Sequence, residues 1–180
     1  MVCAELQLYL RRAHRHQWRR APDIERRLHA DSPEGLRIDT DATLTIYAQS
    51  QTGDGMGKIV AQISEHDKAA IGGNKNYEAG RLYIHGGVIE ATCMDGSKYA
   101  AGIGGGYGDG SGMKEIAIYH GTVTATGAEY GAGIGGGKNN KHPGTINIYG
   151  GDIKANGGAG GAGIGGGQNR GNWPVNIYGG

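Results

Sequence analysis

Aromatic residues recur at one position of a repeated sequence pattern. The stretch "INIYGG" at 146–151 is typical: two isoleucines alternate with another residue, and an aromatic residue follows the second isoleucine. Because alternate residues of a strand face opposite ways, the aromatic residue is expected on the exposed side. The residues at this position are Tyr47, His85, Tyr119, Tyr149 and Tyr178. Their rings could stack on sugar rings, nucleobases or a partner's apolar side chains, or on one another to stiffen a sheet.

A second group of candidate ligand-binding residues lies in the loops that follow a glycine-rich phrase. These residues are Lys138, Asn139, Asn140, Asn169 and Arg170. Amides and cations could hydrogen-bond sugar hydroxyls or carboxylates, but the same residue types are also typical of solvated loops. Both interpretations stay open.

The phrase itself, "GAGIGGGKNN" at 131–140, looks like a phosphate-binding loop. A loop of that kind precedes a helix and normally occurs once. Here the phrase returns at spacings of 32, 31 and 30 residues, and no Lys-Ser/Thr pair closes it. The isoleucines that mark its copies are Ile71, Ile103, Ile134 and Ile164. We therefore interpret the glycines as corners of a repeated structure.

Each repeat has a hydrophobic period of two, which is typical of strands. In one copy Ile146 and Ile148 alternate with other residues, a Gly-Gly corner follows, and Ile153 and Ala155 alternate again. The phrase around Ile164 supplies a third short strand. Three strands and their corners in roughly 30 residues predict an all-β solenoid, a right-handed parallel β-helix over residues 36–180. Small core residues and 38 glycines suit such a fold in a chain without phenylalanine.

Residues 69–180 resemble a known group of repeats. The phrases "GAGIGGG", "GTINIYGGDIKANGG" and "NIYGG" are similar to the glycine-rich β-helix repeats of cell-surface proteins from anaerobic Gram-positive bacteria. Those repeats are often described as carbohydrate-binding. The resemblance implies a parallel β-helix and a polysaccharide ligand.

The first 35 residues differ from the rest. They hold seven arginines and five acidic residues, with no glycine before Gly35. Segments such as "CAELQLYLRRAHRHQWRR" predict helix, so residues 1–35 form either a helical cap over the open end of the solenoid or a basic docking segment. The residues expected to contact a partner in the second case are Arg11, Arg12, Arg15, Trp18, Arg19 and Arg20.

The last repeat reads "NIYGG", where each earlier copy continues into a further alternating segment. An open coil exposes strand edges and apolar core residues, which favours association with a second chain. We therefore expect a homodimer through the C-terminal coil.

No constellation of catalytic residues is visible. The acids are scattered; Glu90 and Asp152 are near equivalent outer positions, but the intervening coil has threonines. No catalytic residue, metal ligand or cofactor is expected. Cys3 and Cys93 stand far apart and do not indicate a disulfide framework, and no segment is apolar enough to span a membrane. The chain as given is expected in the cytoplasm, or outside the cell if it is an excerpt of a surface protein.

These observations favour a non-catalytic binding module that engages an extended glycan through its outer aromatic and polar face. The alternative is an intracellular protein-binding or inhibitor protein, of the kind encoded by phages or mobile elements, that docks on a macromolecular partner. A structural spacer within a longer array is a third possibility.

Overall fold

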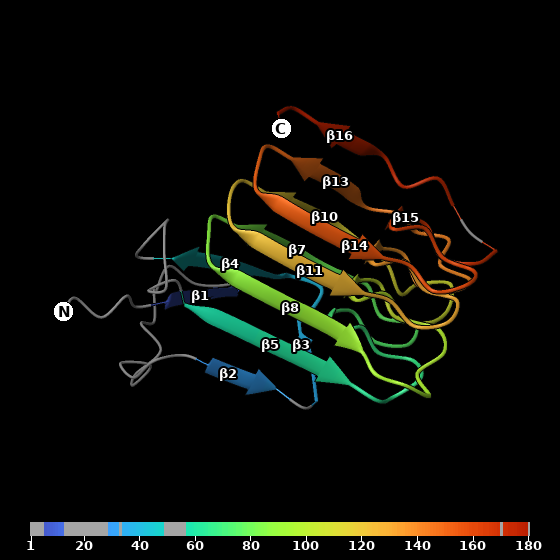
Figure 1. The fold of residues 1–180 in the computed structure, drawn as a ribbon. Helices are drawn as coiled ribbons and strands as arrows, with labels where there is room; N and C mark the ends of the chain where they lie inside the picture. The colour runs from blue at the N-terminus through green and yellow to red at the C-terminus, as the bar shows by residue number, and fades with distance from the viewer. Residues whose placement is uncertain (1–5, 13–28, 33, 49–56, 170, 180) are drawn as a thin grey trace.

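Every regular element in the described part of the chain is a β-strand. The computed structural model describes residues 6–12, 29–32, 34–48, 57–169 and 171–179. The strands form three sheets, here called sheets A, B and C, and the chain visits them in turn (Figure 1).

Sheet A consists of β1 (Leu6–Arg12), β4 (Ala42–Ala48), β7 (Ala79–Ile84), β10 (Met113–Ile118), β13 (Thr145–Ile148) and β16 (Val175–Ile177). Sheet B consists of β2 (His29–Ser32), β5 (Lys58–Ile63), β8 (Val88–Cys93), β11 (Thr122–Thr126) and β14 (Asp152–Asn156). Sheet C consists of the two-residue strands β3 (Leu36–Arg37), β6 (Ile71–Gly72), β9 (Ile103–Gly104), β12 (Ile134–Gly135) and β15 (Ile164–Gly165).

Apart from β1, the strands of each sheet run parallel because each turn of the chain stacks on the one before. One coil contributes one strand to each sheet, and the next coil repeats the order. The pairing keeps equivalent residues in register, so that Ile84 lies beside Ile118 and Ile118 beside Ile148. The prediction of an all-β parallel solenoid is confirmed, with about four coils.

The core is a bundle of aliphatic ladders. Ile84 and Ile118 of sheet A, Ile89 of sheet B and Ile134 of sheet C are all 0 % exposed. Each lies above its counterpart at the strand spacing of about 4.8 Å. Period-two alternation therefore places β-branched residues inside on all three sides, and the outward positions are left for polar and aromatic residues.

Glycine is required where sheet C turns. Gly104 and Gly135 have φ angles of +132° and +133°, a region that L side chains rarely adopt. A Cβ on Gly104 would lie 2.0 Å from the carbonyl oxygen of Gly135 in the next coil. The repeated "IGGG" phrase thus marks a corner at which consecutive coils approach closely.

The helix predicted for the N-terminal segment is wrong over two stretches. Residues 6–12 form β1, which pairs antiparallel with β4, and residues 29–32 form β2, which pairs parallel with β5. The leucines of "LQLYL" alternate with period two, and pairing with an open strand edge overrides a modest helix propensity. The division of the chain after residue 35 stays a prediction.

The predicted docking residues cannot be placed as a group. Arg11 and Arg12 belong to β1, whereas Arg15, Trp18, Arg19 and Arg20 lie outside the described residues. Over the described ranges, no helix has the length and apolar character needed to cross a membrane.

Candidate functional site on the outer face of sheet A

The five aromatic residues predicted from the sequence form one continuous stack, here called the aromatic ladder. Ring centroids are 4.6 Å apart for Tyr47 and His85 and 4.4 Å for His85 and Tyr119. The distance is 4.7 Å for Tyr119 and Tyr149, and again for Tyr149 and Tyr178. All four pairs are within 7° of parallel.

Strand register produces this stack. Each aromatic residue directly follows the last core residue of its sheet A strand, and its backbone N–H continues the parallel pairing. The Tyr119 N–H donates to the Ile84 carbonyl and the Tyr149 N–H to the Ile118 carbonyl, both at 2.8 Å. The strand spacing of about 4.8 Å is close to the distance at which aromatic rings stack.

Stacking leaves the edges of the inner rings, rather than their faces, available to a ligand. Tyr119 has His85 on one face and Tyr149 on the other, and Tyr149 lies between Tyr119 and Tyr178. Tyr149 is nevertheless 41 % exposed. The pKa of Tyr149 is raised by partial burial and then by the neighbouring phenols of Tyr178 and Tyr119. Because the rings of Tyr119, Tyr149 and Tyr178 are stacked nearly parallel, their hydroxyl groups lie in a row along the solenoid.

His85 differs from the other members of the ladder because it can carry a charge. Burial, followed by the nearby His120, lowers the pKa of His85 below its usual value of 6.5. Neutral imidazole is thus favoured between the rings of Tyr47 and Tyr119.

A polar network lies beside the ladder on the same face of sheet A. The carboxylate of Glu115 accepts hydrogen bonds from the Tyr83 hydroxyl at 2.8 Å and from Asn147 Nδ2 at 3.1 Å. The amide of Asn176 donates to Asn147 Oδ1 at 2.9 Å, and Arg81 Nε lies 3.8 Å from Glu115. Sequence reasoning missed this row, although its members occupy alternate positions of the strands that carry the ladder.

Glu115 bridges two neighbouring coils over its own strand. Ala117, the outward residue between Tyr83 and Asn147 in the strand register, is only 1 % exposed. Burial and the hydrogen bond to Glu115 raise the pKa of Tyr83 to about 12. Tyr83 is therefore a hydrogen-bond donor at neutral pH.

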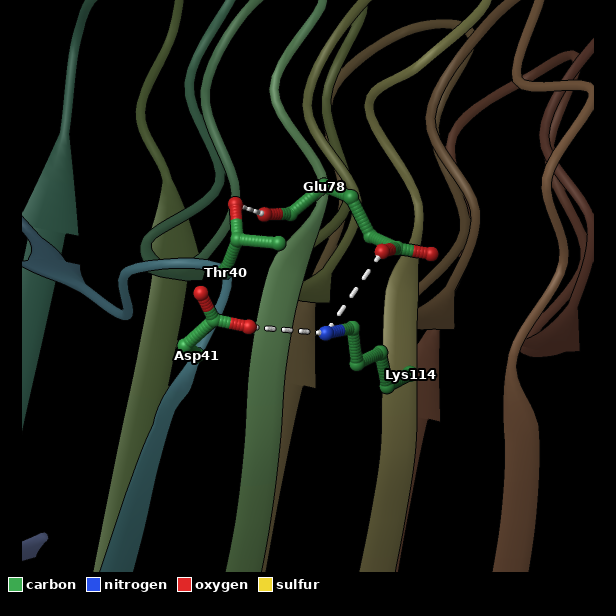
Figure 2. Close-up of polar contacts among 4 residues, drawn as sticks. All are labelled: Thr40, Asp41, Glu78 and Lys114. Carbon is green, nitrogen blue, oxygen red and sulfur yellow. Dashed lines mark hydrogen bonds and ion pairs between the residues drawn. The ribbon is translucent and has the colours of Figure 1, made fainter. Parts of the chain in front are cut away.

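A second polar cluster fastens the beginning of sheet A. Figure 2 shows Lys114 between two carboxylates, with Nζ 3.3 Å from Asp41 and 4.0 Å from Glu78. The hydroxyl of Thr40 donates to the Glu78 carbonyl at 2.6 Å. These residues come from three successive coils. Because both carboxylates share one lysine, the arrangement is an ion-pair clamp between coils.

The predicted loop residues fall into different environments. Asn139 and Asn169 have φ angles of +61° and +60°, and their side-chain amides are 3.5 Å apart. Both stay candidates for ligand contact, whereas Arg170 lies outside the described residues. Asn140 is 0 % exposed, and its Oδ1 accepts a hydrogen bond from the His142 N–H. The side chain of Asn140 is therefore inside the fold, and not on the surface where a ligand contact was expected.

Lys138 belongs to a further aromatic group that the sequence analysis did not recognise, here called the tyrosine–lysine cluster. Its members are Tyr99, Tyr107, Tyr130, Lys75 and Lys138. Tyr99 is 4.7 Å from Tyr107 and 6.1 Å from Tyr130 between ring centroids. Lys138 Nζ lies 4.1 Å from the Tyr130 centroid and 5.3 Å from that of Tyr99. Tyr99 and Tyr130 each precede a phrase isoleucine by four residues, and this shared position is the signal that could have revealed them.

The acids considered for catalysis are not brought together. Asp152 lies in register with Thr122, and Glu90 with Thr124, so the two occupy different columns of sheet B. Glu90 pairs instead with Lys58 at 2.7 Å. Among the described residues, no three His, Cys, Asp or Glu side chains are grouped so that they could hold a metal ion.

Cys93 is a buried free thiol with a pKa raised to about 11, mainly by burial. A thiol in this state is an inert core residue rather than a nucleophile. Cys3 lies outside the described residues.

Comparison with known families agrees with the coil geometry. A family model described as a β-helix repeat matches residues 82–107, 116–138 and 146–168. These segments are parallel β-helix repeats. Each match begins on sheet A and ends in the loop after the "IGGG" phrase. Searches among curated proteins and among solved structures gave no match to this chain.

Proposed function

We propose that this protein is a non-catalytic binding module that engages an extended glycan along the outer face of sheet A. The observation that carries the proposal is the pair of parallel rows on that face: the aromatic ladder and, beside it, the amides of Asn147 and Asn176. Both rows follow the solenoid axis, so a polymer lying along them meets an aromatic ring at each coil and an amide at the coils of Asn147 and Asn176. The resemblance to glycine-rich repeats of surface proteins supports the same ligand class.

The stacked arrangement determines how a glycan binds. Sugar rings cannot enter between Tyr119 and Tyr149, because their facing ring surfaces are already in contact. The exposed phenol hydroxyls and the neighbouring amides instead donate to and accept from sugar hydroxyls, while ring edges cover the apolar side of the sugar. Affinity then grows with polymer length, since each added sugar meets a further coil.

A double substitution separates this mode from simple stiffening of the sheet. Tyr119→Phe with Tyr149→Phe keeps the stack and removes two hydroxyls. On an array of neutral polysaccharides followed by titration calorimetry, we expect binding roughly tenfold weaker than in the wild type, at unchanged stability. Tyr77→Phe is the matched control, since Tyr77 is 65 % exposed and lies outside the ladder. A silent array, or equal binding by the double variant, would contradict the proposal.

The alternative, docking on a protein partner through the arginine-rich N-terminal segment, is tested in the same experiment. Replacing Arg11, Arg12, Arg15, Arg19 and Arg20 by glutamine, rather than deleting the segment, retains β1 as a strand of sheet A and should leave glycan binding intact if sheet A carries it. Loss of a stoichiometric protein partner in this variant, together with a silent array, would favour the alternative.

Self-association through the C-terminal coil also stays a proposal. Val175 and Ile177 are 37 % and 67 % exposed, whereas the equivalent Ile146 and Ile148 are buried. Light scattering at high concentration should give the molar mass of a dimer for the unsubstituted chain. The Ile177→Lys variant should have the molar mass of a monomer. A monomer without the substitution would exclude this interface.

A further inference from the structure

The tyrosine–lysine cluster lies apart from the proposed glycan face. Lys138 is in the loop that precedes β13, whereas Tyr149 of the aromatic ladder directly follows β13. The cluster joins the loop between sheets B and C, which carries Tyr99 and Tyr130, to the loop that leads from sheet C back to sheet A. Backbone hydrogen bonds fasten the two loops, because the Lys138 N–H donates to the Tyr99 carbonyl at 2.7 Å.

Lys98 and Lys138 are the lysines of these loops, among the described residues, whose charge is not matched by a carboxylate, and Lys138 is the one that lies against aromatic rings. Lys75 pairs with Asp67 at 3.1 Å and Lys141 with Asp109 at 2.6 Å. Lys138 has no carboxylate within ion-pair distance among the described residues. Its ammonium is held instead against the faces of Tyr130 and Tyr99.

Aromatic rings hold an ammonium group without using its hydrogen-bond donors. The attraction comes from the negative face of the ring, so it leaves N–H groups that can donate to an acceptor on the side away from the rings. A half-buried, positioned ammonium of this kind binds an anionic oxygen more strongly than a freely rotating surface lysine, because less side-chain entropy is lost.

We propose that Lys138, held by Tyr99 and Tyr130, is a binding site for an anionic substituent of a polysaccharide, a carboxylate or a sulfate. This site is separate from the ladder, but the choice of a polysaccharide as its ligand rests on the proposed function. Glu129 is the opposing group: its nearby carboxylate raises the pKa of Tyr130. Its negative charge weakens anion binding next to the ring on which Lys138 rests.

The test compares three polymers of matched length: polygalacturonate, dextran sulfate and neutral dextran. Binding of the full chain is measured by affinity electrophoresis at two salt concentrations. We expect at least one acidic polymer to bind more tightly than dextran, and Lys138→Met to weaken that binding about tenfold. Lys75→Met is the matched control because Lys75 also lies over a tyrosine, Tyr107, but is already paired with Asp67; its effect should be much smaller.

Two further variants keep the result interpretable. Lys138→Arg retains the charge and the ring contacts and should retain binding even if Lys138→Met perturbs the loop. Glu129→Gln should strengthen binding. The proposal is overturned if neither acidic polymer binds, or if Lys138→Met and Lys75→Met weaken binding equally, which would indicate unspecific attraction. Because neutral polysaccharides and the Tyr119/Tyr149 variant test the ladder, failure of one proposal is distinguishable from failure of the other.

Discussion

The aromatic ladder and the tyrosine–lysine cluster are built from the same residue type but arranged differently. Rings of the ladder are within 7° of parallel at 4.4–4.7 Å. Within the cluster, Tyr99 is tilted 33° from Tyr107 and 16° from Tyr130, with centroids 4.7 Å and 6.1 Å apart. Regular strands impose one ring geometry at every coil, whereas loops let each ring adapt to its own neighbours.

The two groups also differ in what covers their ring faces. Ladder faces are covered by other rings, so the stack contributes apolar contact between coils. Cluster faces are covered in part by the ammonium groups of Lys75 and Lys138. One group therefore joins successive strands of a sheet through ring contacts, and the other positions a charge.

The largest effect is expected from the core beneath the ladder. Ile118→Ala empties a site that is 0 % exposed and should lower the free energy of unfolding by about 2–5 kcal/mol. Ile177→Ala, at the 67 % exposed end of the same column, should cost no more than about 0.5 kcal/mol. Urea unfolding followed by circular dichroism measures both, and equal costs would show that the core does not order the coils as described.

Removing a ring should lower the free energy of unfolding more in the aromatic ladder than in the tyrosine–lysine cluster. Tyr119→Ala abolishes two stacking contacts and should destabilise the fold by about 1–3 kcal/mol. Tyr130→Ala loses one looser ring contact and a lysine contact, so about 1 kcal/mol is expected. Urea unfolding measures both costs, and near-ultraviolet circular dichroism should lose more signal in the Tyr119 variant. A larger loss at Tyr130 would reverse the comparison.

Acid should lower the stability of the fold through protonation of His85 in the aromatic ladder. The unfolded chain protonates this residue near pH 6.5, whereas the folded chain does so only at lower pH, because burial and His120 lower the pKa. The unfolded state thus binds more protons in this window, and stability falls as the pH drops below 6.5. Unfolding midpoints between pH 5 and 7.5 test this, and His85→Tyr should flatten the dependence. An unchanged slope in that variant would assign the effect to other groups.

The smallest effect is expected from the lysine of the cluster. Lys138→Met removes the cation–π contacts of a half-buried lysine and should change the free energy of unfolding by less than about 1 kcal/mol. The same urea titration serves as the measurement. A cost of several kcal/mol would make Lys138 a structural residue and would weaken the case for its role in anion binding.

Much of the fold was predictable because coil spacing and period-two alternation are both written in the order of residues. The column of Tyr119 and Tyr149 followed from its position after the buried isoleucines. Asn140 could not be placed in this way: it stands in the same polar run as Asn139, and only the path of the loop puts its side chain inside. The strand at residues 6–12 was missed because its partners in β4 lie 30 to 42 residues away in the chain, from Arg12 with Ala42 to Leu6 with Ala48.

The sequence by itself determined the repeat, the three strands of each coil, the aliphatic core and the outward aromatic column, since these depend on spacing and alternation along the chain. Only the tertiary structure decided which surfaces of those rings remain available. Stacking of coils turns the ladder's ring faces toward one another, and it brings Lys138 from one loop onto Tyr99 and Tyr130 of another. Contacts between coils depend on side-chain directions that no local pattern specifies.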